Sequence, residues 1–137
     1  MSDAIKEMIF YHDVFDGIVG DVYDLPNRKG ENEAKIKVGQ VNLCLIDENP
    51  SYECFRPKKN EVDSIWLQKT VDNVEEVLEK AHPHGSIVTQ EIAELMGTKH
   101  AIILDPFGYT WTINQIIDEI SLEERYAKYQ EMQAEME

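Results

Sequence analysis

The predicted order of helices and strands repeats once along this chain of 137 residues. Residues 3–47 begin with a helical pattern followed by three strand patterns, and residues 64–114 show the same order with one extra strand in front. A repeat of roughly fifty residues indicates two similar units that bury their apolar faces together. We therefore expect one α+β domain, 1–137, in which an αβββ module and a βαβββ module carry helices on their outer faces and border an open groove.

The first module follows from the spacing of its apolar residues. Apolar residues at positions 4, 5, 8, 9, 14 and 15 fit a helix over Asp3–Phe15. Further along, a stretch that alternates apolar and basic residues precedes a nearly continuous apolar run, and their close spacing is typical of a hairpin. The three strands expected after the helix cover 18–25, 34–38 and 41–47.

The second module and the C-terminus follow a long connection, 48–63, that is rich in proline and polar residues. Asp72 or Asn73 is positioned to cap a helix that runs to Ala81. A capping box at Ser121 predicts an acidic C-terminal helix over 121–137. The expected strands cover 64–71, 86–89, 100–104 and 109–114, and the stretch up to Met96 is ambiguous.

The charge and the apolar runs exclude several classes of protein. A net charge of −14 would repel a nucleic acid over most of the surface, so no nucleic-acid partner is expected. No apolar run approaches the roughly 20 residues of a membrane helix, and the first residues lack the pattern of a secretory signal. We therefore predict a cytoplasmic protein with no membrane partner, in which Cys44 and Cys54 remain thiols.

Three strings carry a resemblance to a known family. They are Asp105–Trp111 (DPFGYTW), the acidic segment Ile117–Arg125 (IDEISLEER) and Phe10–Gly17 (FYHDVFDG). Together with the repeat, they resemble the vicinal-oxygen-chelate superfamily, also called the glyoxalase/bleomycin-resistance/dioxygenase group, and within it the PhnB-like branch. The resemblance covers residues 3–128 and implies paired βαβββ modules, with the first strand of the first module missing.

The resemblance also bears on metal binding. Catalytic members commonly hold a divalent metal with His, Gln or Glu side chains from strand one and strand four of each module. Here the first of these strands has no counterpart, and Thr112 stands where a glutamate is often found. The remaining candidates are Gln68, Asp47 and His100. We therefore expect no cofactor and no conventional metal site, with a divalent metal as the alternative.

The four histidines do not form a convergent set of metal ligands. His82 and His84 flank a proline between the predicted helix and the next strand. This position favours solvent-exposed loop residues over a pair of metal ligands. His12 is expected on the wet face of the first helix. His100 begins a strand, where it serves either as a general base facing the groove or as a strand-edge residue bonded to the backbone.

Charge and aromatic residues suggest how a ligand is held. Residues 28–59 carry a local charge of +2 on an otherwise anionic chain. If the connection folds over the groove, Arg56 offers its forked donors to a carboxylate or phosphate; otherwise these cations only keep the region soluble. Tyr109 and Trp111 share one strand face, as core or as pocket wall, and core is favoured for Trp111. The expected ligand-binding residues are Arg56, Trp66, Gln68, Tyr109 and Trp111.

The residues and the resemblance are compatible with three functions. The first is a PhnB-like protein that binds a small apolar or anionic molecule without a metal. The second is a metal-dependent lyase, isomerase or dioxygenase in which His100 is the candidate catalytic residue. The third is an interaction module that uses the acidic helix 121–137. Because the missing strand exposes a sheet edge, we also predict a homodimer.

Overall fold

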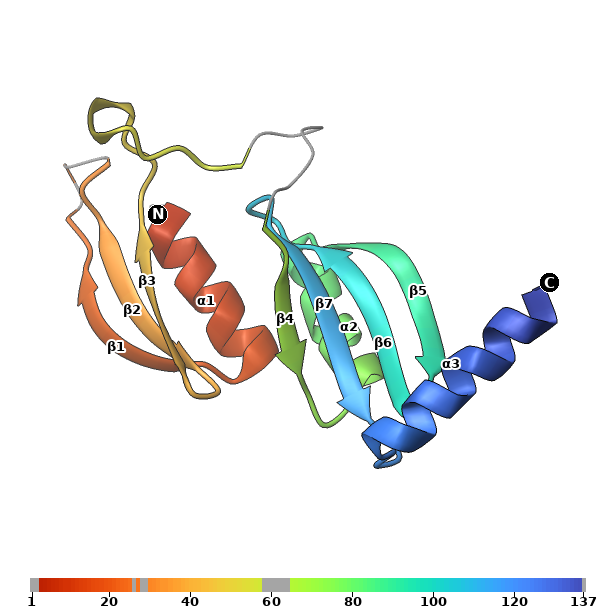
Figure 1. Cartoon of the computed structure of the whole chain (residues 1–137). Helices are drawn as coiled ribbons and strands as arrows, with labels where there is room; N and C mark the ends of the chain where they lie inside the picture. Colours follow the sequence, from red (N-terminus) through yellow and green to blue (C-terminus); the bar gives the residue numbers. More distant parts are fainter. Residues whose placement is uncertain (1–2, 26, 28–29, 58–64, 137) are drawn as a thin grey trace.

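The chain forms two small β-sheets with a helix packed between them (Figure 1). The computed structural model describes residues 3–25, 27, 30–57 and 65–136. The first sheet has the strand order β1-β2-β3 and the second has the order β4-β7-β6-β5. The second sheet thus has one more strand than the first, in agreement with the α+β fold of paired modules predicted from the sequence.

The first module comprises a helix and three antiparallel strands. Ala4, Tyr11 and Phe15 lie on one side of the helix and are buried, and Phe10 and Val14 are buried beside them. Helix α1 packs on β2 of the first sheet. The strands β2 and β3 form the predicted hairpin, with Val38 paired to Val41 at its turn. The bounds are α1 (Asp3–Phe15), β1 (Ile18–Tyr23), β2 (Glu33–Val38) and β3 (Val41–Ile46).

The second module contains one parallel and two antiparallel strand pairs. Strand β4 runs parallel to β7, whereas β6 pairs antiparallel with both β5 and β7. The side chain of Asn73 accepts a hydrogen bond from Glu76 N, and Asn73 is therefore the helix cap. The bounds are β4 (Leu67–Thr70), α2 (Val74–Ala81), β5 (Ile87–Leu95), β6 (Thr98–Leu104), β7 (Thr110–Ile116) and α3 (Leu122–Met136).

Two strand predictions in this module differ from the structure. The stretch up to Met96 belongs to β5, which continues to Leu95 despite two irregularities in its pairing with β6. Strand β4 is shorter than the predicted 64–71, since Ile65 and Trp66 precede its first paired residue, and residue 64 lies outside the described residues.

The two helices lie on the side where the modules meet, which corrects the predicted arrangement. The ring of Tyr11 on α1 packs on Trp111 of β7 with centroids 5.6 Å apart, and that of Phe15 packs on Trp111 at 4.8 Å. Helix α1 also contacts α2. The expectation of outer helices and an inner groove within one chain is therefore wrong: the helix-bearing faces join the modules. The opposite face of the first sheet is exposed, and that of the second sheet is partly buried over β6 and β7.

Two of the sequence segments that resemble the family, Phe10–Gly17 and Asp105–Trp111, make contacts where the two modules meet. Phe10 of the first string meets Phe107 of the DPFG turn with ring centroids 5.9 Å apart. Gly17 ends that string because a Cβ there would lie 2.5 Å from Ile36 Cδ1. The string Phe10–Gly17 thus packs both against its own sheet and against the DPFG turn of the second module.

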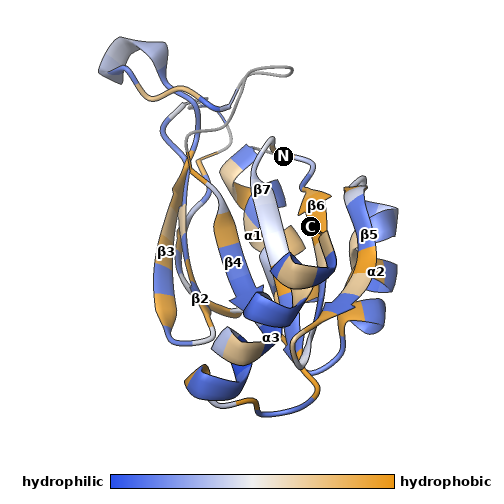
Figure 2. Cartoon of the chain, turned by 45° about the vertical axis from the view of Figure 1, so that its right-hand side comes forward, coloured by the Kyte–Doolittle hydropathy of each residue, from blue (hydrophilic) through white to orange (hydrophobic). Residues whose placement is uncertain are grey.

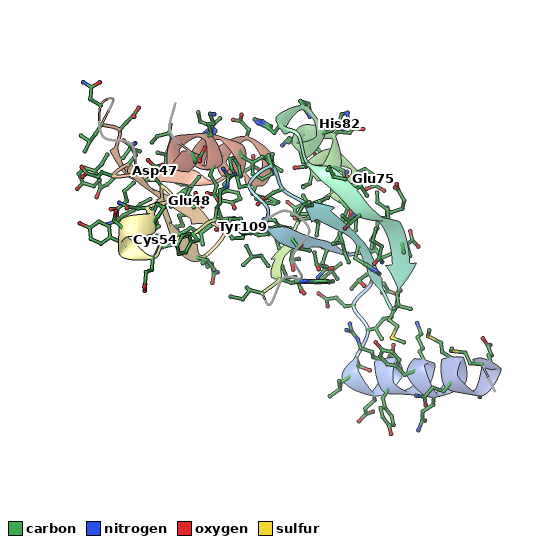
Figure 3. The ribbon with its side chains drawn as sticks, turned by 90° about the horizontal axis from the view of Figure 1, so that it is seen from above. Asp47, Glu48, Cys54, Glu75, His82 and Tyr109 are labelled. Carbon is green, nitrogen blue, oxygen red and sulfur yellow. The ribbon has the colours of Figure 1, made fainter. Side chains whose placement is uncertain are left out.

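Helix α3 projects away from the rest of the molecule (Figures 1 and 3). It has no buried residue in its described length, and Leu122 is 83% exposed. Hydrophobic residues also run along most of β3, at the edge of the first sheet (Figure 2). None of the described helices is both long enough and apolar enough to cross a membrane.

Candidate functional site

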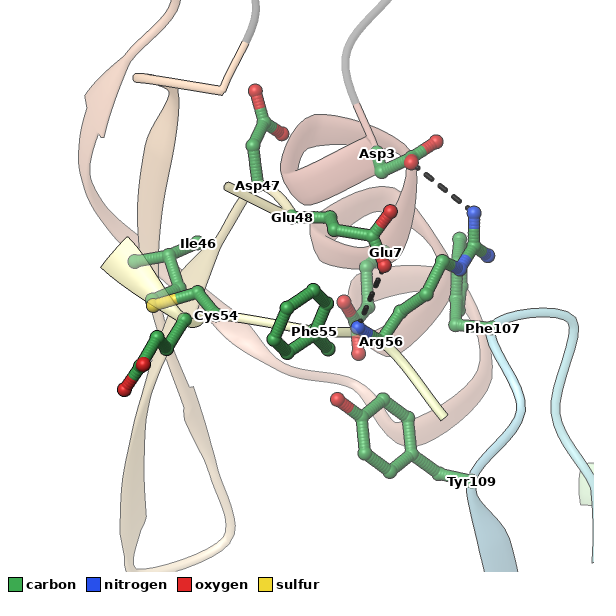
Figure 4. A pocket seen from close by; sticks show the side chains of 11 residues that line it. Asp3, Glu7, Ile46, Asp47, Glu48, Cys54, Phe55, Arg56, Phe107 and Tyr109 are labelled. Carbon is green, nitrogen blue, oxygen red and sulfur yellow. Dashed lines mark hydrogen bonds and ion pairs between the residues drawn. The ribbon is translucent and has the colours of Figure 1, made fainter. Parts of the chain in front are cut away.

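A cavity of about 340 Å³ lies where the start of α1, the end of β3 and the β6–β7 turn converge (Figure 4). We call it the Glu7 pocket. Its charged lining residues are Asp3, Glu7, Asp47, Glu48, Glu53 and Arg56, and the others are Ile46, Cys54, Phe55, Phe107 and Tyr109.

The segment after β3 forms one wall because it closes on itself. Asn49 N donates to Cys54 O at 2.9 Å and Cys54 N donates to Asn49 O at 3.1 Å, around the short 3-10 helix Pro50–Tyr52. The Asn49 side chain also donates to Gly30 O, which ties the loop to the first sheet. The residues that follow this closed loop, Phe55 and Arg56, therefore lie over the first turns of α1.

Asp47 holds this edge of the first module together. It is 6% exposed, and its carboxylate accepts hydrogen bonds from Ala4 N at 3.0 Å and from Asn32 Nδ2 at 2.7 Å. Gly30 N and Asn32 N donate to the same carboxylate. Burial alone would raise the pKa of Asp47, but these donors more than offset it and hold the pKa below its usual range.

Glu7 is in the opposite electrostatic situation. Burial raises its pKa to about 7, and the nearby charge of Asp105 adds to that effect. Tyr11, one turn further along α1, donates its hydroxyl to Glu7 Oε1 at 2.9 Å and lies 3.3 Å from Asp105 Oδ2. Glu7 is thus a carboxyl group, facing a cavity, that changes its protonation near neutral pH.

Asp105 anchors the β6–β7 turn behind Glu7. Its Oδ1 accepts from Phe107 N and Tyr109 N, each at 2.9 Å, and its Oδ2 accepts from Trp111 Nε1 at 2.9 Å. Burial nevertheless raises the pKa of Asp105. These bonds fix the turn that presents Phe107 and Tyr109 to the pocket.

The structure brings two of the predicted ligand-binding residues together. Arg56 and Tyr109 both line the Glu7 pocket. The Arg56 guanidinium donates to Asp3 Oδ2 at 3.2 Å at the rim, so it is already paired with a carboxylate. Burial raises the pKa of Tyr109, which keeps its hydroxyl neutral.

The other predicted residues lie elsewhere. Trp111 is 4% exposed in the core, which leaves it as a packing residue. Gln68 pairs with Thr112, and His100 with Asn114, on the sheet face opposite the buried Trp111. Trp66, 60% exposed, precedes β4.

The candidate metal ligands are divided between the two sheets, since Asp47 follows β3 whereas Gln68 and His100 lie on the second sheet. Asp47 uses its oxygens for backbone amides, and His100 Nε2 lies 3.3 Å from the side-chain nitrogen of Gln90. His84 contacts Asp13 at 3.2 Å and the ring of Phe10. Within the described parts of the chain, no group of three or more His, Cys, Asp or Glu side chains is placed to hold a metal ion.

The two cysteines differ in position. Cys54 lines the pocket, with its Sγ 3.7 Å from Tyr52 O. Cys44 lies on the exposed face of the first sheet and donates to Glu33, and this bond raises the pKa of the thiol. Cys44 is therefore poorly reactive at neutral pH.

Glu7, which the structure places at the centre of the site, is absent from the residues predicted from the sequence. A signal for it exists: Asp3, Glu7 and Tyr11 occur at intervals of four, a spacing that aligns side chains on one helix face. That face lies next to apolar positions of the same helix, where an acidic residue is costly unless it has a function or a partner.

The fold and the motifs are those of a known family. The family model of the Glyoxalase/Bleomycin resistance protein/Dioxygenase superfamily matches residues 2–113. The chain therefore belongs to this superfamily, which confirms the resemblance drawn from the sequence. It is 23% identical over 129 residues to the uncharacterized protein Rv0887c of Mycobacterium tuberculosis, covering 90% of this chain and 75% of that protein.

Solved structures support the same fold. A PhnB protein from Bacillus cereus, described as a putative 3-demethylubiquinone-9 3-methyltransferase, is similar with a TM-score of 0.61 and 17% identity, covering 83% of this chain and 92% of that one. The fosfomycin resistance protein FosX from Listeria monocytogenes, complexed with Mn(II) and sulfate, has a TM-score of 0.63 and 14% identity, covering 94% and 90%. At these identities the likeness establishes the fold alone.

Proposed function

We propose that this protein binds a small, largely apolar molecule in the Glu7 pocket without a metal ion. The observation that carries this proposal is the cavity itself, whose volume of about 340 Å³ falls in the range of small-ligand sites. Phe55, Phe107 and Tyr109 supply aromatic surface that holds a flat body by burial and stacking. Polar groups at the same site provide orientation.

The distribution of charge refines the ligand expected from the sequence. The sequence predicts Arg56 as the partner of an anionic ligand, but the structure pairs it with Asp3. Glu48 and Glu53 line the same cavity. An anion would therefore approach several carboxylates to reach one cation that is already engaged, and an apolar ligand without negative charge fits the site better.

Titration with an apolar probe tests the proposal. We expect 2-phenylethanol to shift the NMR signals of residues lining the Glu7 pocket, and Tyr109→Ala to weaken this binding roughly fivefold through lost ring contact. Tyr52→Ala, which removes a tyrosine that is 77% exposed and does not line the pocket, is the matched control and leaves binding unchanged. No saturable shift in the pocket would overturn the proposal, as would equal binding by the Tyr109→Ala variant.

The metal-free part of the proposal has its own test. Elemental analysis of protein purified without chelators is expected to give no stoichiometric Ni, Zn, Mn or Fe. A stoichiometric metal removed by mutation of Gln68 or His100 would instead favour the metal-dependent lyase, isomerase or dioxygenase.

We also propose that the protein is a cytoplasmic homodimer. The exposed face of the first sheet supports this assembly: Ile18 is 68% exposed and Ile46 is 53% exposed on it. Helix α3 adds an unpacked apolar stripe, and a helix of 15 residues is marginal in water without packing partners. The stripe comprises Leu122, Tyr126, Tyr129, Met132 and Met136.

Light scattering after size-exclusion chromatography measures this assembly directly. A dimeric mass is expected at micromolar protein concentration, and replacement of Leu122 and Tyr126 by serine is expected to shift the population toward monomer. A monomer in the unmodified protein would overturn the proposed dimer. A dimer that persists in the serine variant would assign the interface to the open sheet faces and remove α3 from it.

A further inference from the structure

The lining of the Glu7 pocket combines aromatic rings with an excess of carboxylates. Among the described side chains that line it, five are carboxylates and one, Arg56, is a cation. Asp3 neutralises Arg56 at the rim, and Asp47 is held by backbone amides. Glu48 accepts a hydrogen bond from Arg56 N at 2.9 Å and keeps its charge (Figure 4). Together with Glu7 and Glu53, it gives the cavity a negative potential beside the rings of Phe107 and Tyr109.

The single proton of the Tyr11 hydroxyl distinguishes Glu7 from Asp105 as the carboxyl group that still lacks hydrogen-bond donors. The Tyr11 hydroxyl lies within hydrogen-bond distance of both Glu7 and Asp105 but carries one proton. Asp105 already has three other donors, two from backbone amides and one from Trp111. Glu7 is the less satisfied of the two carboxyl groups, and its side chain faces the cavity.

We propose that the pocket selects an organic cation, with an apolar body against Phe107 and Tyr109 and a protonated amine that donates to Glu7. This inference rests on the proposed function and specifies the charge of its ligand. The pairing satisfies Glu7 with a charge-assisted hydrogen bond, and the aromatic rings attract the cation through their faces. An anion of the same shape is excluded by the same carboxylates.

Binding of a cation is coupled to the protonation of Glu7. Because burial raises the pKa of Glu7 to about 7, part of the population carries a proton at neutral pH, and a bound ammonium group favours its release. Affinity for a cation therefore increases as the pH rises from 6 to 8. The groups that act on Glu7 are Asp3 and Tyr11 on its own helix, Arg56 on the loop, and Asp105 and Tyr109 at the β6–β7 turn. Glu48 and Glu53 of the loop line the same cavity.

Three probes of similar shape test the charge selection. They are 2-phenylethylamine, which stays protonated below pH 8, neutral 2-phenylethanol and anionic 3-phenylpropanoate. We expect the amine to bind roughly tenfold more tightly than the alcohol at pH 7.5, because a hydrogen bond to a charged group contributes that order of affinity. The propanoate is expected to bind more weakly than the alcohol.

Glu7→Gln separates this inference from the proposed function. The variant is expected to lose the preference for the amine and its increase between pH 6 and 8, while its affinity for the alcohol stays within about twofold. Glu79→Gln, the same change at an exposed position of α2, keeps the preference. Equal binding of amine and alcohol by the unmodified protein would overturn the proposal that the pocket selects a cation. An unchanged preference for the amine in Glu7→Gln would overturn it as well. If none of the three probes binds, the proposed function of the Glu7 pocket as a ligand-binding site is overturned.

Discussion

Asp47 and Glu7 are two carboxyl groups at the same edge of the molecule, and their environments differ in the number of donors. Asp47 accepts hydrogen bonds from Ala4, Gly30 and Asn32, and its pKa falls. Glu7 has the Tyr11 hydroxyl, which also approaches Asp105, and its pKa rises. The comparison indicates that a carboxylate surrounded by amides supports the fold, whereas one facing a cavity with few donors is available for a ligand.

The largest expected change in the free energy of unfolding follows from mutation of Asp47, the carboxylate that accepts hydrogen bonds from backbone amides. Asp47→Ala leaves the amides of Ala4 and Asn32 without their acceptor, and we expect a loss of about 3 kcal/mol in the free energy of unfolding. Urea denaturation at fixed protein concentration measures it. Asp21→Ala, at an exposed position of β1, is the control and changes stability little. A loss in Asp47→Ala no larger than in the control would break the comparison.

The pH dependence of stability distinguishes the two carboxyl groups by sign. The folded pKa of Glu7, about 7, lies above its ordinary value of 4.5, so its contribution is complete below pH 4.5 and is lost as the pH rises through 7. The folded pKa of Asp47 is lowered, so its contribution is lost as the pH falls.

Glu7→Gln removes the first of these contributions. Between pH 5 and pH 8, the unmodified protein is expected to lose about 2 kcal/mol more unfolding free energy than this variant, as measured by urea denaturation at each pH. Glu79→Gln is expected to follow the unmodified protein. The same pH slope in Glu7→Gln and in the unmodified protein would show that Glu7 is not the titrating group.

Asp105 is the intermediate case, with several donors and a raised pKa. Asp105→Asn keeps an oxygen for the amides of Phe107 and Tyr109 but loses the acceptor of the Trp111 indole N–H. We expect a loss of about 1.5 kcal/mol in unfolding free energy, since one buried donor is left unpaired. An effect as large as that of Asp47→Ala would mean that the charge, rather than the count of donors, determines the contribution.

More of the fold than of the candidate site could be predicted from the sequence. Helix α1 and the β2–β3 hairpin followed from local spacing, and the family strings identified the superfamily. The side on which the modules meet depends on long-range contacts, such as Phe15 on Trp111, that no local pattern contains. Likewise, Asp47 and Glu7 are both acidic residues in the sequence, and their roles separate only when the fold supplies backbone amides to one and a cavity to the other.

The smallest effect is expected at the rim, where Asp3 pairs with Arg56 and both side chains are roughly half exposed. Asp3→Asn removes an ion pair screened by water and one charge near the start of α1, so we expect a change below about 0.5 kcal/mol in unfolding free energy. It frees the Arg56 guanidinium, however, and the affinity for 3-phenylpropanoate should rise while that for 2-phenylethylamine falls. Titration of both probes against the variant measures this exchange. Unchanged affinities for the two probes would show that the rim pair does not contribute to the charge selected by the pocket.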